Sequence, residues 1–308
     1  MVGDFANFMC SAGLIPGDVI PDGRWHRCPT EAHPKKRNGS WKLALDGLIG
    51  WCQDFAVHTE PLTWRPDKDN LAQVDHSAIA RRREIGRRTL IRATSAARAF
   101  YTSCAWLRGG HPYLSAHGLD MTGCHGLKID LDGWLVVPVR LGRSLVSVQR
   151  ISPEGEKLFW PGASVKGASY TIERTNASIS VLCEGLATGL AIFAAAPLVR
   201  VIAAFNAGNL ARVQMPPGMT VVAADNDHET ATRIGSNPGL DAAGVAAAVL
   251  GCGVAVPTGI EGTDFCDWRQ EMVARRLASR VKERESDIRL AVDAEIAEMM
   301  MRNAKFRV

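Results

Sequence analysis

The stretch VVAADNDHE, residues 221–229, joins an apolar run to a pair of acids. Residues 221–224 have the composition of a buried strand, and Asp225 and Asp227 follow it directly. Two negative charges at the end of a buried strand indicate either a surface turn or a metal site. The surrounding sequence decides between these alternatives, because a metal site needs further ligands from other strands.

From residue 178 onward, short apolar strands alternate with alanine-rich helical segments such as NPGLDAAGVAAAVL, residues 237–250. Continuous apolar strands alternating with helices are typical of a parallel sheet that is covered on both faces. Ligands of such sheets bind beyond the carboxyl ends of the strands. We therefore predict an α/β domain over residues 176–268, with its functional site at that edge.

Acidic residues follow three of these predicted strands. Glu184 comes directly after ISVLC, Asp225 and Asp227 follow TVVAA, and Asp264 and Asp267 follow the last strand. Carboxylates brought together repel one another, and a divalent cation removes that repulsion. An all-oxygen ligand set favours Mg2+ or Mn2+. For Asp264 and Asp267, capping of the terminal helix is the alternative interpretation.

The remaining chain is expected to form four further parts. The sequence predicts a small β-rich module over residues 1–60. It predicts a linker followed by basic helices over residues 61–107. Residues 108–175 alternate Val and Leu runs with turns, which is typical of antiparallel hairpins in a β-rich basic lobe. Residues 269–308 belong to one long C-terminal helix that begins near Asp267. The predicted fold class is thus α/β for the domain at residues 176–268 and α+β for the whole chain.

Composition limits the possible classes of protein. The 308 residues carry a net charge of +4, and residues 24–100 contain 15 Lys and Arg against 8 Asp and Glu. This basic segment is compatible with nucleic-acid contact or with a solvated surface. No apolar stretch spans a bilayer, no signal peptide is expected, and eight scattered cysteines suit a reducing bacterial cytoplasm.

Several segments together resemble one family. SVLCEGLATGLAIF, VIAAFNAGNLARV, VVAADNDHETAT and GTDFCDW are similar to a TOPRIM domain, and more narrowly to DnaG-related primases of bacteriophages and conjugative plasmids. LVVPVR and LVSVQRISPEGEKLFWPG resemble the lobe that precedes TOPRIM in that family. RWHRCPTEAHPKKRNGSWKLALDGLIGWCQDF resembles its zinc-finger region in degenerate form. In the family's later acidic pair, Asn usually stands where this chain has Cys266.

The resemblance implies a DNA primase that makes short RNA primers by metal-dependent nucleotidyl transfer. It implies catalytic roles for Glu184, Asp225 and Asp227, with Asp264 as a further metal or supporting group. Candidates for binding nucleotide phosphates are the basic residues of the preceding lobe and two asparagines at a strand end: Arg140, Arg150, Lys157, Lys166, Asn206 and Asn209. Surface exposure is the alternative for the cations, and helix capping for the asparagines.

Partners follow from the same resemblance: a single-stranded DNA template, nucleoside triphosphates and a replicative helicase supplied in trans, since no P-loop motif is present. Expected DNA contacts are Lys35, Lys36, Arg37, Trp41, Arg81, Arg82, Arg83, Arg87 and Arg88. Trp41 packs into the module's core in the alternative interpretation. A TOPRIM nuclease and a non-catalytic single-strand-binding accessory protein are the rival functions.

Zinc is a separate question for the N-terminal module. Cys28, His33 and Cys52, with His26 or His58 as a fourth ligand, invite a zinc site. Structural zinc usually uses two closely spaced ligand pairs, and the second pair is missing here. The spacing therefore favours a metal-free module with a tryptophan core.

Overall fold

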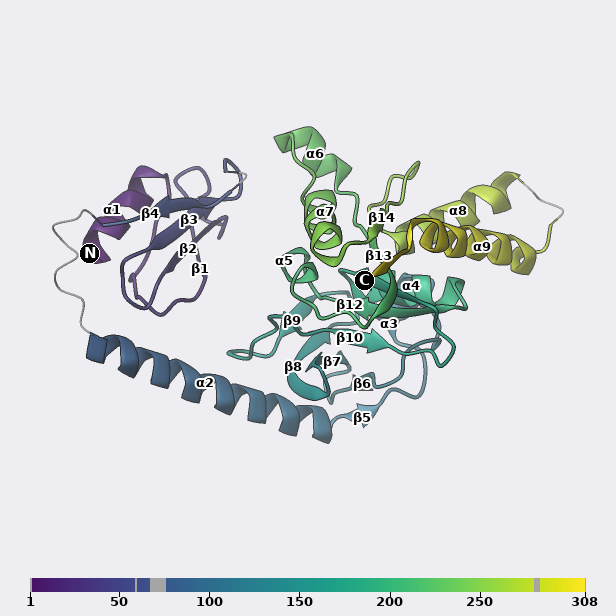
Figure 1. Cartoon of the computed structure of the whole chain (residues 1–308), viewed down its shortest axis with the longest axis horizontal. Coiled ribbons are helices and arrows are strands. Elements are labelled where there is room, and N and C mark those ends of the chain that lie inside the picture. Colours follow the sequence, from purple (N-terminus) through teal and green to yellow (C-terminus); the bar gives the residue numbers. More distant parts are fainter. Residues whose placement is uncertain (1, 59, 67–75, 280–282, 308) are drawn as a thin grey trace. The chain divides into compact units, whose positions relative to one another are not determined.

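The computed structural model describes residues 2–58, 60–66, 76–279 and 283–307 (Figure 1). The chain divides into two compact units, Met1–Ile91 and Arg92–Val308, and each is described by itself. The five-part division drawn from composition stays a prediction. Within the described ranges, no helix has the length and apolar character needed to cross a membrane.

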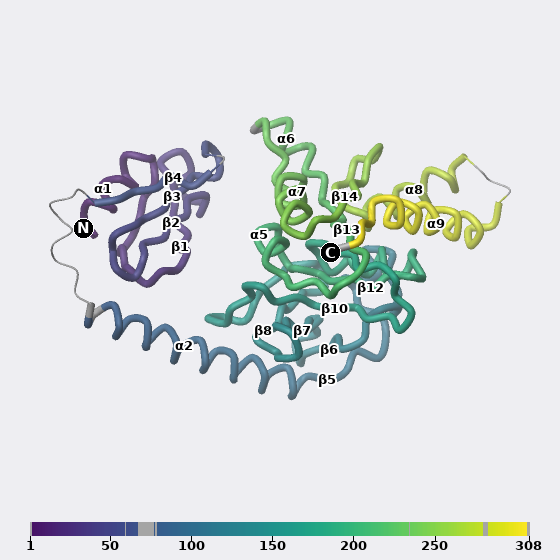
Figure 2. Tube along the Cα trace, in the orientation of Figure 1, coloured from purple at the N-terminus to yellow at the C-terminus, as the bar shows by residue number. Residues whose placement is uncertain are grey.

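The N-terminal unit is a small antiparallel sheet with one helix on its face (Figure 2). The helix is α1 (Val2–Ser11), which the sequence did not predict. The strands run in the order β1-β2-β3-β4: β1 (His26–Cys28), β2 (Gly39–Leu43), β3 (Gly50–Asp54) and β4 (Leu62–Trp64). Residues 61–107 were expected to begin with a linker, but residues 62–64 within them form β4, which pairs with β3.

Strand alternation gives this sheet two different faces. Trp41 and Cys52 are cross-strand partners that point into the core. Phe5 of α1 packs there, and a Cβ at Gly50 would lie 2.3 Å from its ring, so only glycine fits at that position. The opposite face, called the open face below, carries the half-buried side chains of Lys42 and Trp51, which do not belong to this core. The core of this module combines the rings of Phe5, Trp41 and Trp64 with the side chains of Met9, Leu14, Cys28, Leu43 and Cys52.

The predicted basic helix is α2 (His76–Ser103), which runs from the first unit into the second. Its N-terminal half carries a series of exposed arginines. Its C-terminal half packs through Phe100 and Tyr101 against a second antiparallel sheet.

That second sheet has the strand order β5-β6-β7-β8-β9: β5 (Ala105–Trp106), β6 (Lys128–Ile129), β7 (Leu135–Leu141), β8 (Ser144–Ile151) and β9 (Lys157–Phe159). The short helix α3 (Pro112–Ala116) lies between β5 and β6 in the chain. All neighbouring strands pair antiparallel, as the alternating Val and Leu runs predicted.

The third sheet is mixed and mostly parallel. Its order is β10-β12-β11-β13-β14, and β15 also pairs with β13. The strands are β10 (Tyr170–Ile172), β11 (Ile179–Cys183), β12 (Val199–Ala203), β13 (Gly218–Ala223), β14 (Gly253–Ala255) and β15 (Lys305–Arg307). The predicted α/β class with an antiparallel lobe is confirmed. Two antiparallel strands, β10 and β15, join a sheet expected to be purely parallel.

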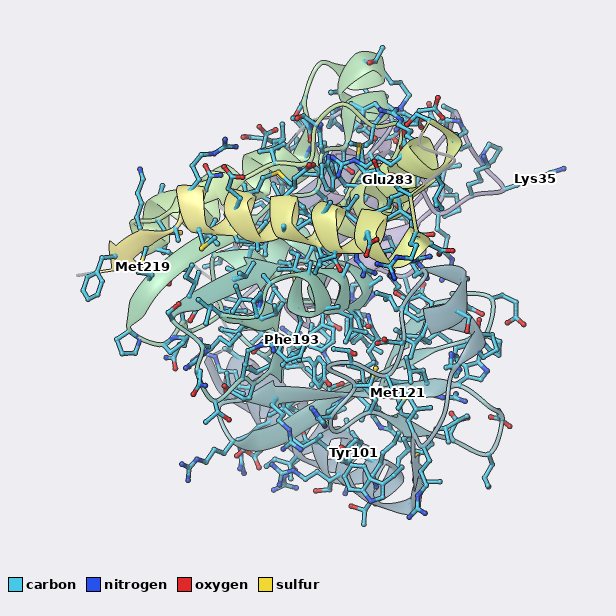
Figure 3. The ribbon with its side chains drawn as sticks, turned by 90° about the vertical axis from the view of Figure 1, so that its right-hand side faces the viewer. Lys35, Tyr101, Met121, Phe193, Met219 and Glu283 are labelled. Carbon is cyan, nitrogen blue, oxygen red and sulfur yellow. The ribbon has the colours of Figure 1, made fainter. Side chains whose placement is uncertain are left out.

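Helices cover both faces of this sheet. On one face lie α4 (Leu186–Ala195), α8 (Phe265–Ser279) and α9 (Glu285–Asn303), and on the other α5 (Ala207–Leu210) and α7 (Pro238–Leu250). The helix α6 (His228–Ile234) follows the acidic loop. Phe193 of α4 is buried in the same apolar core as the inner side chains of α9, and this core continues to β7 and β8 (Figure 3). The second and third sheets therefore share one interior.

The prediction of a single C-terminal helix was wrong. Two helices, α8 and α9, pack against each other and are joined by the ion pair Arg269–Asp293, with a nitrogen–oxygen distance of 2.6 Å. Ile288, Val292 and Ile296 of α9 are buried in the core that also contains the side chains of α4. The spacing of apolar residues breaks at Glu285, where α9 begins. The break in periodicity was the signal for two helices.

Candidate active site

The acids converge because β11 and β13 are parallel neighbours. Val181 pairs with Val221, so the two strands end side by side and bring Glu184 and Asp225 to one edge. Asp264 reaches the same place from the start of α8. These three acids line a cavity of about 190 Å³ together with the side chains of Lys157 and Tyr113.

Asp225 is the most strongly perturbed of these acids. Burial, followed by the charges of Asp264, Glu184 and Asp227, raises its pKa to about 8, and Lys157 opposes this rise. Its Oδ1 atom is buried and has no hydrogen-bond partner. A buried carboxylate oxygen without a donor is costly unless a cation or a proton occupies the place opposite it.

The pKa of Glu184 is also raised, and by similar causes. Burial and the charge of Asp227 raise its pKa, while the Ala207 N–H group and Lys157 lower it. The Glu184 carbonyl accepts a hydrogen bond from the Phe205 N–H at 2.8 Å. This bond fixes the backbone at the point where the strand passes into the loop.

Asp227 is positioned by helix α7. Its Oδ2 accepts a hydrogen bond from the Gly239 N–H at 2.9 Å, and its own N–H donates to Asn237 Oδ1 at 3.0 Å. A Cβ at Gly239 would lie 2.3 Å from the Asp225 carbonyl oxygen. The glycine therefore permits the close approach that holds both aspartates. Asn226, between them, donates instead to the Pro257 carbonyl.

Asp264 combines the two roles that the sequence left open. Its Oδ1 accepts from the N–H groups of Cys266 and Asp267 at the start of α8, which is a helix cap. Its Oδ2 accepts from Thr188 Oγ1 at 2.6 Å. Asp267 turns away and accepts from the Thr263 N–H. Asp264 thus contributes negative charge to the site while its own oxygens are already hydrogen-bonded.

The side chains fit a hard divalent cation by charge and donor type. Asp225 offers a buried oxygen with no donor, and Glu184 and Asp227 raise the negative potential around it. Within the described ranges, no three His, Cys, Asp or Glu side chains are already gathered at metal-binding distances. A cation at this edge would be held by Asp225 with Glu184 or Asp227 and by water or phosphate oxygens, as is usual for Mg2+.

We expect Asp225→Asn to stabilise the metal-free protein in a pH-dependent way. The folded pKa of about 8 exceeds the ordinary value of 3.8. The stabilising effect of the bound proton is therefore complete below pH 4 and is lost as pH rises through 8. In EDTA, the melting temperature of the variant should exceed that of wild type by on the order of 5 °C at pH 8.5, and by less at pH 5.5. A difference independent of pH would contradict the assigned pKa.

The predicted phosphate-binding residues occupy different environments. Lys157 alone among them lines the acidic cavity. Arg150 is neutralised by Asp130 at 2.7 Å and by Asp132 at 3.0 Å. Lys166 is exposed on a loop, and Arg140 lines a separate cavity. For Arg150, the ion pairs give a structural role in place of the predicted phosphate contact.

The two asparagines also differ from each other. Asn206 is the N-cap residue of α5, without a side-chain capping bond. Asn209 is 3% exposed, and its amide donates to the carbonyls of Val165, Ala168 and Ala204 while its Oδ1 accepts from the Gly167 N–H. Because every polar atom of Asn209 is engaged, this residue holds the loop before β10 in place and has no group left for a nucleotide.

Sequence reasoning missed two aromatic residues at the acidic cavity. Phe205 has a φ of 71°, the only positive value outside glycine in the described chain, and it packs edge-on against Phe159. Such backbone strain in a bulky residue often occurs at functional sites. Tyr113 lies under Lys157, with 5.7 Å between the ammonium and the ring centre. Phe205 lies within the quoted segment VIAAFNAGNLARV, but neither ring was singled out, because the proximity of both to the acids depends on tertiary packing.

The candidate zinc ligands lie in or beside the core of the N-terminal unit. Cys28 and Cys52 are buried, and burial raises the pKa of each thiol to about 11. His33 and His58 do not gather with them into a group that could hold a metal, within the part of the chain described.

The predicted DNA contacts divide into exposed and engaged side chains. Lys35, Lys36 and Arg37 are exposed on the loop before β2, and Arg83 is exposed on α2. Four arginines of α2 already interact with other groups of the protein. Arg82 donates to the Leu45 carbonyl, Arg87 and Arg88 form ion pairs with Glu84, and Arg81 also has an interaction partner. Trp41 is 3% exposed, so its ring serves the core and cannot stack on a base.

The open face of the N-terminal sheet carries a different aromatic set. The Arg27 guanidinium lies 4.4 Å from the centre of the Phe55 ring, and Lys42 Nζ lies 5.4 Å from that of Trp51. Cations beside partly exposed rings are suited to bind single strands, because the rings stack on bases and the cations meet phosphates. Trp51 lies on this face and Trp41 on the other because of the register between β2 and β3, in which Trp41 pairs with Cys52 and Lys42 with Trp51.

We expect Phe55→Ala to weaken binding of single-stranded DNA by roughly 5- to 100-fold, the usual cost of losing one stacking contact. Fluorescence anisotropy with a labelled oligonucleotide measures the effect. Val57→Ala is the matched control, since Val57 is exposed on the same loop and has no ring. Equal affinities of the two variants would show that the open face does not stack on bases.

Comparison with known proteins agrees with this geometry. Residues 179–295 match the Toprim domain family. The DNA primase TraC of Escherichia coli is 26% identical over 287 residues, which are 80% of this chain and 19% of that protein. The chain therefore spans about a fifth of the length of this curated relative.

Two solved structures are also similar. Primase domains of two bacteriophage T7 gp4 subunits, bound to an RNA/DNA hybrid and dTTP with the lagging-strand DNA polymerase, match at 18% identity with a TM-score of 0.41, covering 64% of this chain and 92% of that one. The primase fragment of the T7 primase-helicase matches at 18% identity with a TM-score of 0.38, covering 58% and 80%. Residues 179–295 of this chain thus belong to the Toprim domain family, and the chain is distantly similar to the DNA primase TraC.

Proposed function

We propose that this protein is a DNA primase, which synthesises short RNA primers on single-stranded DNA by metal-dependent nucleotidyl transfer. One observation carries the proposal: Glu184, Asp225 and Asp264 line a single cavity in which a buried Asp225 oxygen has no protein partner. The relation to a primase supports the choice of reaction. Mg2+ or Mn2+ would bind at Asp225 with Glu184 or Asp227.

In this reaction a ribose 3′-hydroxyl attacks the α-phosphate of a nucleoside triphosphate, and pyrophosphate leaves. The bound metal supplies charge neutralisation on the phosphates and acidifies the attacking hydroxyl. Glu184, whose pKa is raised by burial and by Asp227, is suited to accept the hydroxyl proton. Lys157 provides a positive charge to the triphosphate from the opposite wall of the cavity.

The aromatic residues of the cavity serve a different purpose. Phe205 and Tyr113 form apolar surface beside the acids, and both are almost fully buried. Apolar walls exclude water, which strengthens the electrostatic interactions in the site and limits hydrolysis of the triphosphate. The exposed basic loop at Lys35–Arg37 and the open face of the N-terminal sheet would hold the template. A replicative helicase would act in trans.

Primer synthesis tests this proposal. Single-stranded DNA of mixed sequence is incubated with labelled ribonucleoside triphosphates and Mg2+ or Mn2+, with wild type beside Asp225→Ala. Short labelled RNA from wild type alone is the expected result. Metal-dependent shortening of the DNA without RNA would indicate a Toprim nuclease. Neither product, with DNA still bound, would favour a single-strand-binding accessory protein.

A further inference from the structure

A second, larger cavity lies apart from the acids. It has a volume of about 590 Å³ and lies between the end of β7, the loop before β6, the edge strand β10 and the segment after α5. We call it the β7–β10 cavity. None of its lining residues lines the acidic cavity. Arg140, predicted from sequence as a phosphate contact, faces this cavity together with Arg143 and His125.

The two arginines give the β7–β10 cavity a positive charge. Arg140 is held in place, because its Nη1 donates to the Arg143 carbonyl at 3.2 Å and its guanidinium contacts the Tyr101 hydroxyl. Tyr101 in turn donates to the Gly126 carbonyl at 2.7 Å. Across the described ranges, neither arginine forms an ion pair with a carboxylate.

The one acid at this cavity is engaged elsewhere. Glu173 lies 3.8 Å from Arg200 and is largely exposed at the end of the cavity. The backbone beside the cavity is held by hydrogen bonds. Arg140 and Ser169 exchange two of them, of 2.9 and 2.8 Å, and these join β7 to the segment before β10. The cavity thus presents one guanidinium held by hydrogen bonds, that of Arg140, and one exposed cation, Arg143, and arginine side chains of this kind are suited to bind phosphate.

Size and surface narrow the class of ligand. A volume of about 590 Å³ lies within the range of small-molecule sites, roughly 300–1,000 Å³, and fits a nucleotide. Pro138, Leu141 and Val213 supply apolar surface for a base, and Ser169, Thr171 and Gln214 supply hydrogen-bonding groups. Glycines at positions 126, 142 and 167 have positive φ and leave the backbone open on this side.

We propose that the β7–β10 cavity binds the phosphate groups of a nucleotide, held by Arg140 and Arg143 and without a metal ion. The phosphates come either from a free nucleoside triphosphate or from a nucleic-acid strand. This site is separate from the acidic edge and does not depend on the proposed primase activity. In the absence of a metal, the carboxylates of the acidic cavity repel a triphosphate, so binding measured in EDTA reports on the second cavity.

The test is a titration of wild type in EDTA with mant-ATP, followed by fluorescence, and with labelled octathymidylate, followed by anisotropy. The variants are Arg143→Gln and the double substitution Arg140→Gln with Arg143→Gln. Arg302→Gln is the matched control, since Arg302 is an exposed arginine on α9.

We expect the double substitution to weaken binding by at least about tenfold, because two charge-assisted hydrogen bonds are lost. Arg143→Gln should show a smaller loss, and the control Arg302→Gln should bind like wild type. The single variant keeps the test decisive if the double variant does not fold, since no hydrogen bond of the Arg143 side chain holds the described structure together.

The ligands distinguish the source of the phosphate. Weakened mant-ATP binding assigns the cavity to free nucleotides, and weakened octathymidylate binding without mant-ATP binding assigns it to a strand. Variants that match Arg302→Gln for both ligands would overturn the proposal. No step of this test requires catalysis, so a protein that makes no primers can still support it.

Discussion

Glutamine at position 184 is expected to reduce primer synthesis by at least about 1,000-fold, because the metal and the proton acceptor both depend on that charge. The substitution preserves the size of the side chain and the hydrogen bond from the Phe205 N–H to the Glu184 carbonyl. The fold should therefore persist. Initial rates of labelled RNA synthesis at saturating triphosphate measure the loss.

Binding of single-stranded DNA should survive this substitution, since the exposed cations of the N-terminal unit are unchanged. Glu298→Gln removes the same charge from an exposed position of α9 and should retain full activity. Equal activity of the two variants would remove Glu184 from the active site. Loss of DNA binding together with activity would indicate a folding defect instead of a catalytic one.

The second large effect is expected from Gly239→Ala. A new Cβ would lie 2.3 Å from the Asp225 carbonyl oxygen and 3.0 Å from Asp227 Oδ2. Both atoms belong to the acidic loop, so the loop must shift to accept one methyl group. Displacing catalytic groups by about 1 Å typically costs about 100-fold in rate, and we expect a loss of that order in primer synthesis.

Gly244→Ala provides the matched control in the same helix. No atom lies within 4 Å of a Cβ built at Gly244, and the position is helical. Alanine there should raise the stability of α7 by about 0.5–1 kcal/mol and leave activity unchanged. Similar losses in both variants would show that the effect comes from the helix as a whole and not from contact with the aspartates.

The sequence predicted those features that depend on local pattern. Alternating strands and helices predicted the α/β domain, and strand ends predicted where Glu184 and Asp225 would meet. Both inferences use only the period of the chain and the rule that parallel strands end at a common edge. The resemblance to TOPRIM proteins added the identity of the domain, which the family match to residues 179–295 confirms.

Features that depend on tertiary contacts were not predictable in this way. Arg150 and Lys157 belong to the same lobe and have similar side chains, yet one is neutralised by Asp130 and the other faces the acids. Trp41 and Trp51 lie on different strands and point to opposite faces because their alternation differs. Only the register of the sheet, which no residue type encodes alone, decides which of them is exposed.

Asn209 has a consequence for how residues 92–308 unfold. The side-chain amide of Asn209 takes part in four hydrogen bonds, as donor and as acceptor, that join the loop before β10 to the end of β12. A single apolar core also extends from β7 and β8 to α9. Segments that share one apolar core and a buried hydrogen-bond network unfold cooperatively. Calorimetry of this segment should show one transition, with equal calorimetric and van't Hoff enthalpies. Cutting the chain between residues 175 and 176 should therefore yield two fragments that melt without cooperativity.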